Sequence, residues 1–260
     1  MLEAPEKRKR RDPEVRVWDR FVRLHHWLLV LAFATLYLES SKFPLHTYAG
    51  YLITVLLLMR IVWGFVGKGA ARFSNFRFTP GQTLDYLRGA LHGKAAYHFS
   101  HNPLGAAMVY ALVSMLLLNC LLGMLAYSAS QELGPFGERI PHEWEDVLIQ
   151  IHTWSGHLIA ALILCHLLGV LWAARLHREN YILAMLTGLR RIPRTVPLPT
   201  GVSHPEKPGF IRQRLQRPLE WLNFRRPFVG SLLLMALIIF GIVLPLVAYL
   251  TTFNPGLLAY

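Results

Sequence analysis

Four of the twelve histidines lie within or beside long apolar segments, where ionisable side chains are costly and usually serve a function. His26 and His46 lie at the ends of the first two segments, and His152 and His166 lie on the fourth. If these segments cross a bilayer, His26 matches His166 in depth and His46 matches His152. The pattern therefore predicts two separate pairs of imidazole ligands.

The spacing of His152 and His166 indicates what the pairs bind. Fourteen residues along an α-helix bring two side chains within about 40° of one face and separate them by about 21 Å. The two pairs are therefore too far apart to share one ion. Neutral imidazole is a good axial ligand for haem iron, so the pattern is typical of two bis-histidine haems. His25 is an alternative to His26, but its side chain points about 100° away.

Other residues beside the histidines fit the same hypothesis. Gly50 follows His46 by one turn and Gly156 follows His152 by one turn, which leaves room for a large flat group. Small residues also serve plain helix packing, so the glycines alone are weak indicators. Arg60 lies inside the second apolar segment. Its guanidinium either pairs with a haem propionate or extends to the membrane interface, and we weigh the two readings equally.

Five segments are apolar enough to span a membrane or come close to the roughly 20 residues that a spanning helix needs. They cover about 24–38, 48–66, 104–127, 147–174 and 228–252. We expect an all-α membrane protein: a four-helix transmembrane haem-binding bundle (residues 17–176) plus one additional C-terminal transmembrane helix (residues 228–260). A basic tail (1–16) precedes the bundle, and a basic, proline-broken linker (177–227) follows it.

The positive charges predict the orientation. Of the 27 Lys and Arg residues, 24 lie in 1–23, 67–103 and 175–227, which all fall on one side of the membrane. The positive-inside rule then places the N-terminus in the cytoplasm and the C-terminus outside. The net charge of +12 is therefore mainly topological, and we expect membrane lipid rather than nucleic acid as a partner. The acidic loop 129–146 lies on the outer side and either faces a cationic partner or is simply solvated.

The two cysteines, Cys120 and Cys165, both fall inside apolar segments. Neither belongs to a C-x-x-C-H haem attachment site or to a zinc cluster. Covalent haem, disulfides and cysteine-ligated metal are therefore not expected.

Several ordered motifs resemble the bacterial cytochrome b561 and nickel-iron hydrogenase b-type cytochrome family. The stretch 17–27, ending in His25-His26-Trp27, is similar to its first-helix signature, and that match selects His26 over His25. The stretches 46–51, 60–67, 71–76 and 101–105 also look like the family, as does the fourth helix up to 177–180. The resemblance covers roughly residues 15–190 and implies that His26, His46, His152 and His166 are the haem ligands.

The resemblance also implies an activity. Such proteins carry two haem b groups and pass electrons between the quinone pool and a periplasmic redox protein, such as a c-type cytochrome or a hydrogenase, at the cell inner membrane. We therefore expect an electron-transfer subunit of a respiratory oxidoreductase system, with quinone as a possible substrate. Alternatives are an autonomous superoxide- or quinone-linked oxidoreductase and, in another class, a haemless membrane anchor or metal transporter. His101 and Asn102 are weak candidates for a quinone site.

Overall fold

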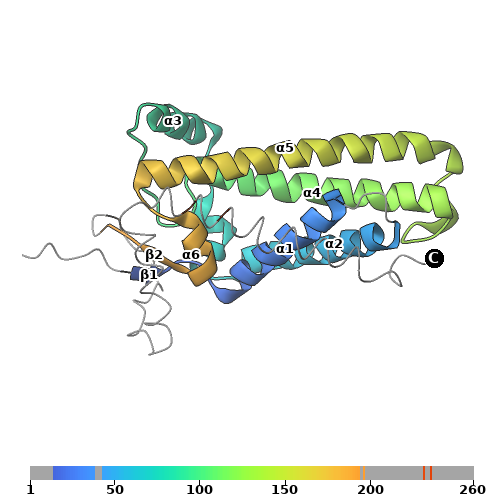
Figure 1. Ribbon diagram of the computed structural model, residues 1–260, viewed down its shortest axis with the longest axis horizontal. Coiled ribbons are helices and arrows are strands. Elements are labelled where there is room, and N and C mark those ends of the chain that lie inside the picture. The colour runs from blue at the N-terminus through green and yellow to red at the C-terminus, as the bar shows by residue number, and fades with distance from the viewer. Residues whose placement is uncertain (1–13, 39–42, 194–195, 197–230, 232–234, 236–260) are drawn as a thin grey trace, which may run out of the picture.

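Four long helices lie lengthwise beside one another in the computed structural model, which describes residues 14–38, 43–193, 196, 231 and 235 (Figure 1). They are α1 (Arg20–Leu38), α2 (Phe43–Val66), α4 (Pro103–Gln131) and α5 (Glu145–His177). Each is long and apolar enough to cross a membrane. Large apolar side chains are exposed along them, as expected where lipid replaces water, and the chain is a multi-pass membrane protein.

All four spans begin before the expected limits, and α4 and α5 also end beyond them. The first helix starts at Arg20 rather than at 24, because the amphipathic turn before the apolar segment is helical as well. α5 extends for 33 residues, or about 50 Å, and so exceeds the roughly 30 Å hydrocarbon core of a bilayer. The polar last turns of this helix therefore reach into the headgroup region.

Side-chain caps determine where three helices begin. The Asp19 carboxylate accepts a hydrogen bond from the Val22 amide at 2.7 Å, before α1. Asn102 caps α4 in the same way, through the Gly105 amide at 2.7 Å, and Pro103 occupies the first helical turn. The short helix α3 (Pro80–Leu91) begins with a capping box formed by Thr79 and Gln82.

The bundle consists of two antiparallel hairpins, because α1 packs mainly on α2 and α4 mainly on α5. Ala32, Ile53 and Leu57 form the buried centre between α1 and α2. Side chains of α4, among them Val113 and Leu116, pack against this centre and join the hairpins.

One end of the bundle carries additional structure, and we call it the basic end: here α1 and α4 begin and α2 and α5 end. Strands β1 (Glu14–Arg16) and β2 (Leu189–Arg191) pair antiparallel there, with Val15 opposite Arg190, beside α6 (Tyr181–Thr187) (Figure 1). The 3-10 helices η1 (Gly69–Ala71) and η2 (Phe73–Phe76) follow α2. This two-stranded sheet is an addition to the expected all-α fold. The last elements, α6 and β2, lie within the stretch that the sequence predicts to be a linker.

A tight connection joins α6 to the sheet. Gly188 ends α6 with φ of +82°, and its carbonyl accepts hydrogen bonds from the amides of Val17 (2.9 Å) and Trp18 (3.2 Å). A β-carbon at Gly188 would lie 2.6 Å from the Trp18 carbonyl oxygen, so only glycine fits. The chain before α1 is thereby fixed to the chain after α6.

The opposite end holds the 3-10 helices η3 (Gly137–Arg139) and η4 (His142–Trp144), which connect α4 to α5. Nearly all of the fifth span expected at 228–252 lies outside the described residues. Within it, Ser231 and Met235 have helical backbone, and Met235 packs beside Ile182 and Leu183. The additional C-terminal helix therefore stays a prediction.

Candidate functional site

His46 and His152 come together near the end of the bundle opposite the basic end. Their ring centroids are 5.9 Å apart and their planes are inclined by 78°. His46 lies in the first turns of α2, and His152 lies two turns into α5. The structure thus brings together one of the two pairs that matching depth predicts.

The ring of His152 is oriented by the backbone of a neighbouring helix. Its Nδ1 lies 3.0 Å from the Asn119 carbonyl oxygen in α4. A carbonyl only accepts hydrogen bonds, so Nδ1 carries the proton and Nε2 keeps its lone pair. Metal-ligating histidines commonly have one nitrogen fixed in this way. The Asn119 side chain is itself fixed, because its oxygen accepts a hydrogen bond from Ser155.

Glycines leave space around this pair. A β-carbon at Gly123 in α4 would lie only 2.9 Å from Cε1 of His152, so a side chain there would displace the ring. Gly50 faces open space, because a β-carbon there would meet nothing within 4 Å, and at Gly156 the nearest atom is the Asn119 amide nitrogen at 3.9 Å. Gly123 lies on a different helix from both histidines, so their local spacing gave no signal for it.

The second predicted pair lies toward the basic end. His26 in α1 is within electrostatic range of His166 in α5, and its Nδ1 is buried without a hydrogen-bond partner in the described part of the chain. The neighbouring His25 donates from Nε2 to the Leu56 carbonyl at 2.9 Å. The His25 ring therefore holds α1 to α2, whereas the His26 ring has a nitrogen that is available to ligate haem iron.

Arg60 is buried on the inner side of α2, with 6% of its surface exposed. Its guanidinium lies 4.8 Å over the ring of Phe73, and Nη1 is buried without a hydrogen-bond partner among the described residues. Asp19, an acid whose charge acts on Arg60, accepts hydrogen bonds from the Val22 amide and from the Trp63 indole at 3.0 Å. The geometry fits an anionic group near Arg60 better than extension of the side chain into water.

His101, a weak candidate for a quinone site, lies between elements, and its ring is packed in the core of the basic end. It lies 4.4 Å from the Phe76 ring and 4.9 Å from the Trp18 ring, measured between centroids. Burial lowers the pKa of His101 to about 3, helped by the nearby charges of Arg60 and Arg190. Its Nδ1 has no hydrogen-bond partner within the described ranges.

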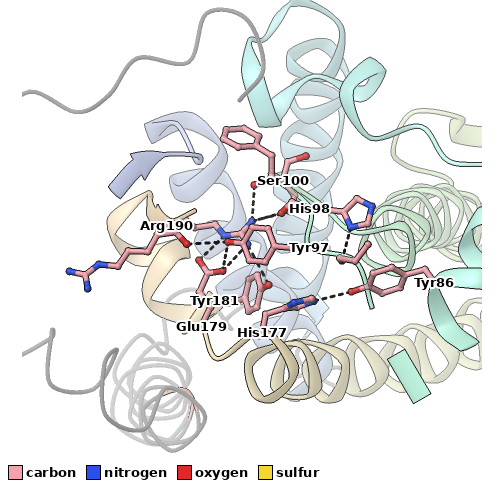
Figure 2. A network of polar contacts seen from close by, with 11 residues as sticks. Tyr86, Tyr97, His98, Ser100, His177, Glu179, Tyr181 and Arg190 are labelled. Carbon is pink, nitrogen blue, oxygen red and sulfur yellow. Dashed lines mark hydrogen bonds and ion pairs between the residues drawn. The ribbon is translucent and has the colours of Figure 1, made fainter. Parts of the chain in front are cut away.

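A buried polar network holds the segment before His101 in place (Figure 2). Two nitrogens of Arg190 each donate to a different Glu179 carboxylate oxygen at 2.8 Å, and both side chains are nearly inaccessible. Although burial opposes its charge, the hydrogen bonds to Glu179 raise the pKa of Arg190. Nη1 of Arg190 also donates to the carbonyls of Phe99 (2.8 Å) and Ser100 (3.1 Å).

Two tyrosines complete the network. Tyr97 donates to Glu179 at 2.8 Å, and both Tyr97 and Tyr181 present their rings to the Arg190 guanidinium. Burial raises the pKa of each phenol, so both remain neutral. The network therefore joins three segments, 97–100, 179–181 and β2, which are far apart in the sequence.

The residues present fit haem. The buried Nδ1 atoms of His26 and His46 have no hydrogen-bond partner among the described residues. Together with the fixed tautomer of His152 and the open space at Gly50, they suit a large planar group held by two imidazoles. The described residues contain no group of three or more His, Cys, Asp or Glu side chains that would enclose a bare metal ion. Cys120 and Cys165 are free thiols.

Comparison with known proteins shows which chains are similar to this one in sequence. The family described as prokaryotic cytochrome b561 matches residues 17–188. The probable Ni/Fe-hydrogenase 1 B-type cytochrome subunit of Escherichia coli K12 is 27% identical over 213 residues, covering 67% of this chain and 89% of that protein. The probable Ni/Fe-hydrogenase B-type cytochrome subunit of Bradyrhizobium diazoefficiens is 24% identical over 217 residues, with 69% and 87% covered. No solved structure gives a significant match.

Proposed function

Because the chain belongs to the prokaryotic cytochrome b561 family, and is thus a membrane b-type cytochrome of electron transfer, we propose that it carries electrons on two haem b groups. His46 and His152 ligate one haem, and His26 and His166 ligate the other. The observation that carries this proposal is the facing of His46 and His152 from different helices, with His152 oriented by the Asn119 carbonyl.

Each haem, when bound, supplies reversible one-electron exchange at its iron. The chain's residues hold and insulate the group. The hydrogen bond from Nδ1 of His152 to Asn119 keeps Nε2 free to ligate and stops the ring from rotating. Gly50, Gly123 and Gly156 keep bulky side chains out of the space beside His46 and His152. Arg60 offers to a haem propionate its Nη1, which has no hydrogen-bond partner in the described part of the chain.

The basic end faces the cytoplasm in this proposal, and the loop between α4 and α5 faces the periplasm, in line with the positive-inside rule. His46 and His152 would then hold their haem on the side that faces a periplasmic redox protein, where it would supply one-electron exchange. The relatives are named as hydrogenase cytochrome subunits, so a hydrogenase is the first candidate and a c-type cytochrome the second. The other redox partner is quinone, for which His101 and Asn102 are the candidate contacts.

Haem content tests the ligand assignment. We expect the purified chain to hold two haem b groups, and His166→Ala or His152→Ala to hold one. His157→Ala is the matched control, because His157 lies on the same helix but is exposed and contacts the Tyr37 hydroxyl at 3.3 Å. Haem is quantified per chain from its pyridine complex. Full haem content in His166→Ala, or equal loss in His157→Ala, would contradict the assignment.

A further inference from the structure

The helix α3 presents three different faces. Tyr86 and Ala90 are buried against the protein. Asp85 and Arg88 form a solvated stripe, with side chains 75% and 65% exposed. Between these faces lies a third stripe of exposed leucines, Leu84, Leu87 and Leu91, at the i, i+3 and i+7 positions of a helix. In water, this third face would be an unexplained apolar surface.

The position of α3 along the bundle explains that face. The Tyr86 hydroxyl lies 3.2 Å from Nε2 of His177, the last residue of α5, so α3 is fixed at the level of that helix end (Figure 1). His177 follows Trp172 by five residues, or about 7.5 Å along the axis. Trp172 is half exposed, as a tryptophan at the membrane interface is. Interfacial helices insert their apolar face by about 5–10 Å at this boundary.

The lipid-facing apolar surface of the bundle also extends to the end at which α3 lies. Exposed apolar side chains continue to the basic ends of the spanning helices, with Phe65 and Val66 in α2 and Leu168 and Trp172 in α5. The bilayer that covers these side chains extends to the depth of α3. No separate partner is needed to cover the leucines.

The charges around α3 select the lipid. Residues 67–103 carry five Lys or Arg and one acid, Asp85, which pairs with Arg88 at 3.5 Å. Such a surface is attracted to anionic headgroups. The chain's own segment 197–230 carries six Lys or Arg against two acids, so its charge has the same sign as that of the loop. Electrostatics thus favours lipid over this segment as the occupant.

We propose that α3 is an interfacial helix, with Leu84, Leu87 and Leu91 inserted into the leaflet at the basic end and the flanking cations bound to anionic headgroups. Anchoring of α3 would also restrain the chain that follows it. The Lys94 amide donates a hydrogen bond to the Gly89 carbonyl at 2.8 Å, and the segment held by Arg190 begins shortly after Lys94. The identity of the leaflet as cytoplasmic depends on the proposed orientation, but the insertion does not.

Adjacent cysteine positions test the insertion. In a Cys120→Ala, Cys165→Ala background, Leu84→Cys and Asp85→Cys are labelled with the environment-sensitive fluorophore NBD. The protein is placed in nanodiscs of phosphatidylethanolamine and phosphatidylglycerol, and only preparations with the parent's haem content are used. We expect a doxyl-labelled lipid to quench the label at position 84 at least threefold more than the label at 85, and iodide to show the reverse order.

Two results would overturn the insertion. Equal iodide quenching at both positions would show that the leucine face is in water, and protection of position 84 from both quenchers would show that protein covers it. The charge part has its own test. Lipid quenching at position 84 should rise with the phosphatidylglycerol fraction, and less so in Arg88→Gln, Lys94→Gln. Quenching that is independent of phosphatidylglycerol would overturn the role of anionic headgroups.

Discussion

His152 illustrates how single residues define the candidate site, because the orientation of its ring depends on a backbone oxygen of another helix. The Asn119 carbonyl determines the tautomer, and Gly123 leaves the room in which the ring can stand. The sequence marks His152 as a ligand candidate through its spacing from His166. Neither Asn119 nor Gly123 could be predicted, because both act across the interface of α4 and α5.

A substitution at Gly123 should therefore remove one haem. We expect Gly123→Leu to reduce the content from two haems per chain to about one, since the new side chain would occupy the space of the His152 ring. Gly169→Ala is the control, because a β-carbon there meets nothing within 4 Å and alanine favours the helix by up to about 1 kcal/mol. Retention of both haems in Gly123→Leu would show that the ring can move aside.

His101 should make the protein less stable in acid. The pKa of His101 in the folded protein, about 3, lies below the ordinary value of 6.5. Between these two pH values the imidazole is protonated in the unfolded chain and neutral in the folded chain. The stabilising effect of a neutral His101 is complete above pH 6.5 and is lost progressively as the pH falls toward 3. Thermal unfolding at pH 7.5 and pH 5 measures it.

The variant His101→Gln should lose less stability between those two pH values than the parent. His92→Gln, at the exposed end of α3, should behave like the parent. If His101→Gln and the parent lose equal stability on acidification, the protonation of His101 is not responsible.

At the scale of elements, the basic end is held by contacts between segments that are distant in sequence. Strand β2, the turn after α5 and the segment before α4 all meet at Arg190 (Figure 2). The length of the apolar segments alone predicts the four spanning helices, because backbone groups in lipid must form their hydrogen bonds within the segment. It does not predict the three-residue strands or this ion pair, which exist only once the bundle has formed.

Breaking this ion pair should destabilise the protein strongly. In Glu179→Ala the buried guanidinium of Arg190 would lose its counter-charge, which typically costs about 3–5 kcal/mol. Asp85→Ala breaks the exposed pair with Arg88 and should change the stability by less than about 0.5 kcal/mol. Denaturant titration in detergent, followed through helix content and haem absorbance, measures both. Similar effects of the two variants would show that the Arg190–Glu179 pair contributes little.

At the scale of the whole molecule, charge and apolar surface divide the chain in a consistent way. The basic end collects the sheet, α3, α6 and the polar network, whereas the opposite end has short 3-10 turns and exposed acids such as Glu132, Glu143 and Asp146. The four spans could be predicted within a few residues. Nearly all of the predicted fifth span lies outside the described residues.

The proposed orientation can be tested on intact cells. In the cysteine-free background, Glu138→Cys in η3 should react with a membrane-impermeant maleimide in spheroplasts, because the 24 topogenic cations hold the other end inside. Lys94→Cys, exposed at the basic end, should react only after the membrane is permeabilised. Both positions lie in exposed turns, so equal labelling is expected once the membrane is open, and that measurement normalises the first. Labelling of Lys94→Cys but not Glu138→Cys in spheroplasts would invert the orientation and move the acidic turns to the cytoplasm. The outer haem would then face a cytoplasmic partner, which the positive-inside asymmetry argues against.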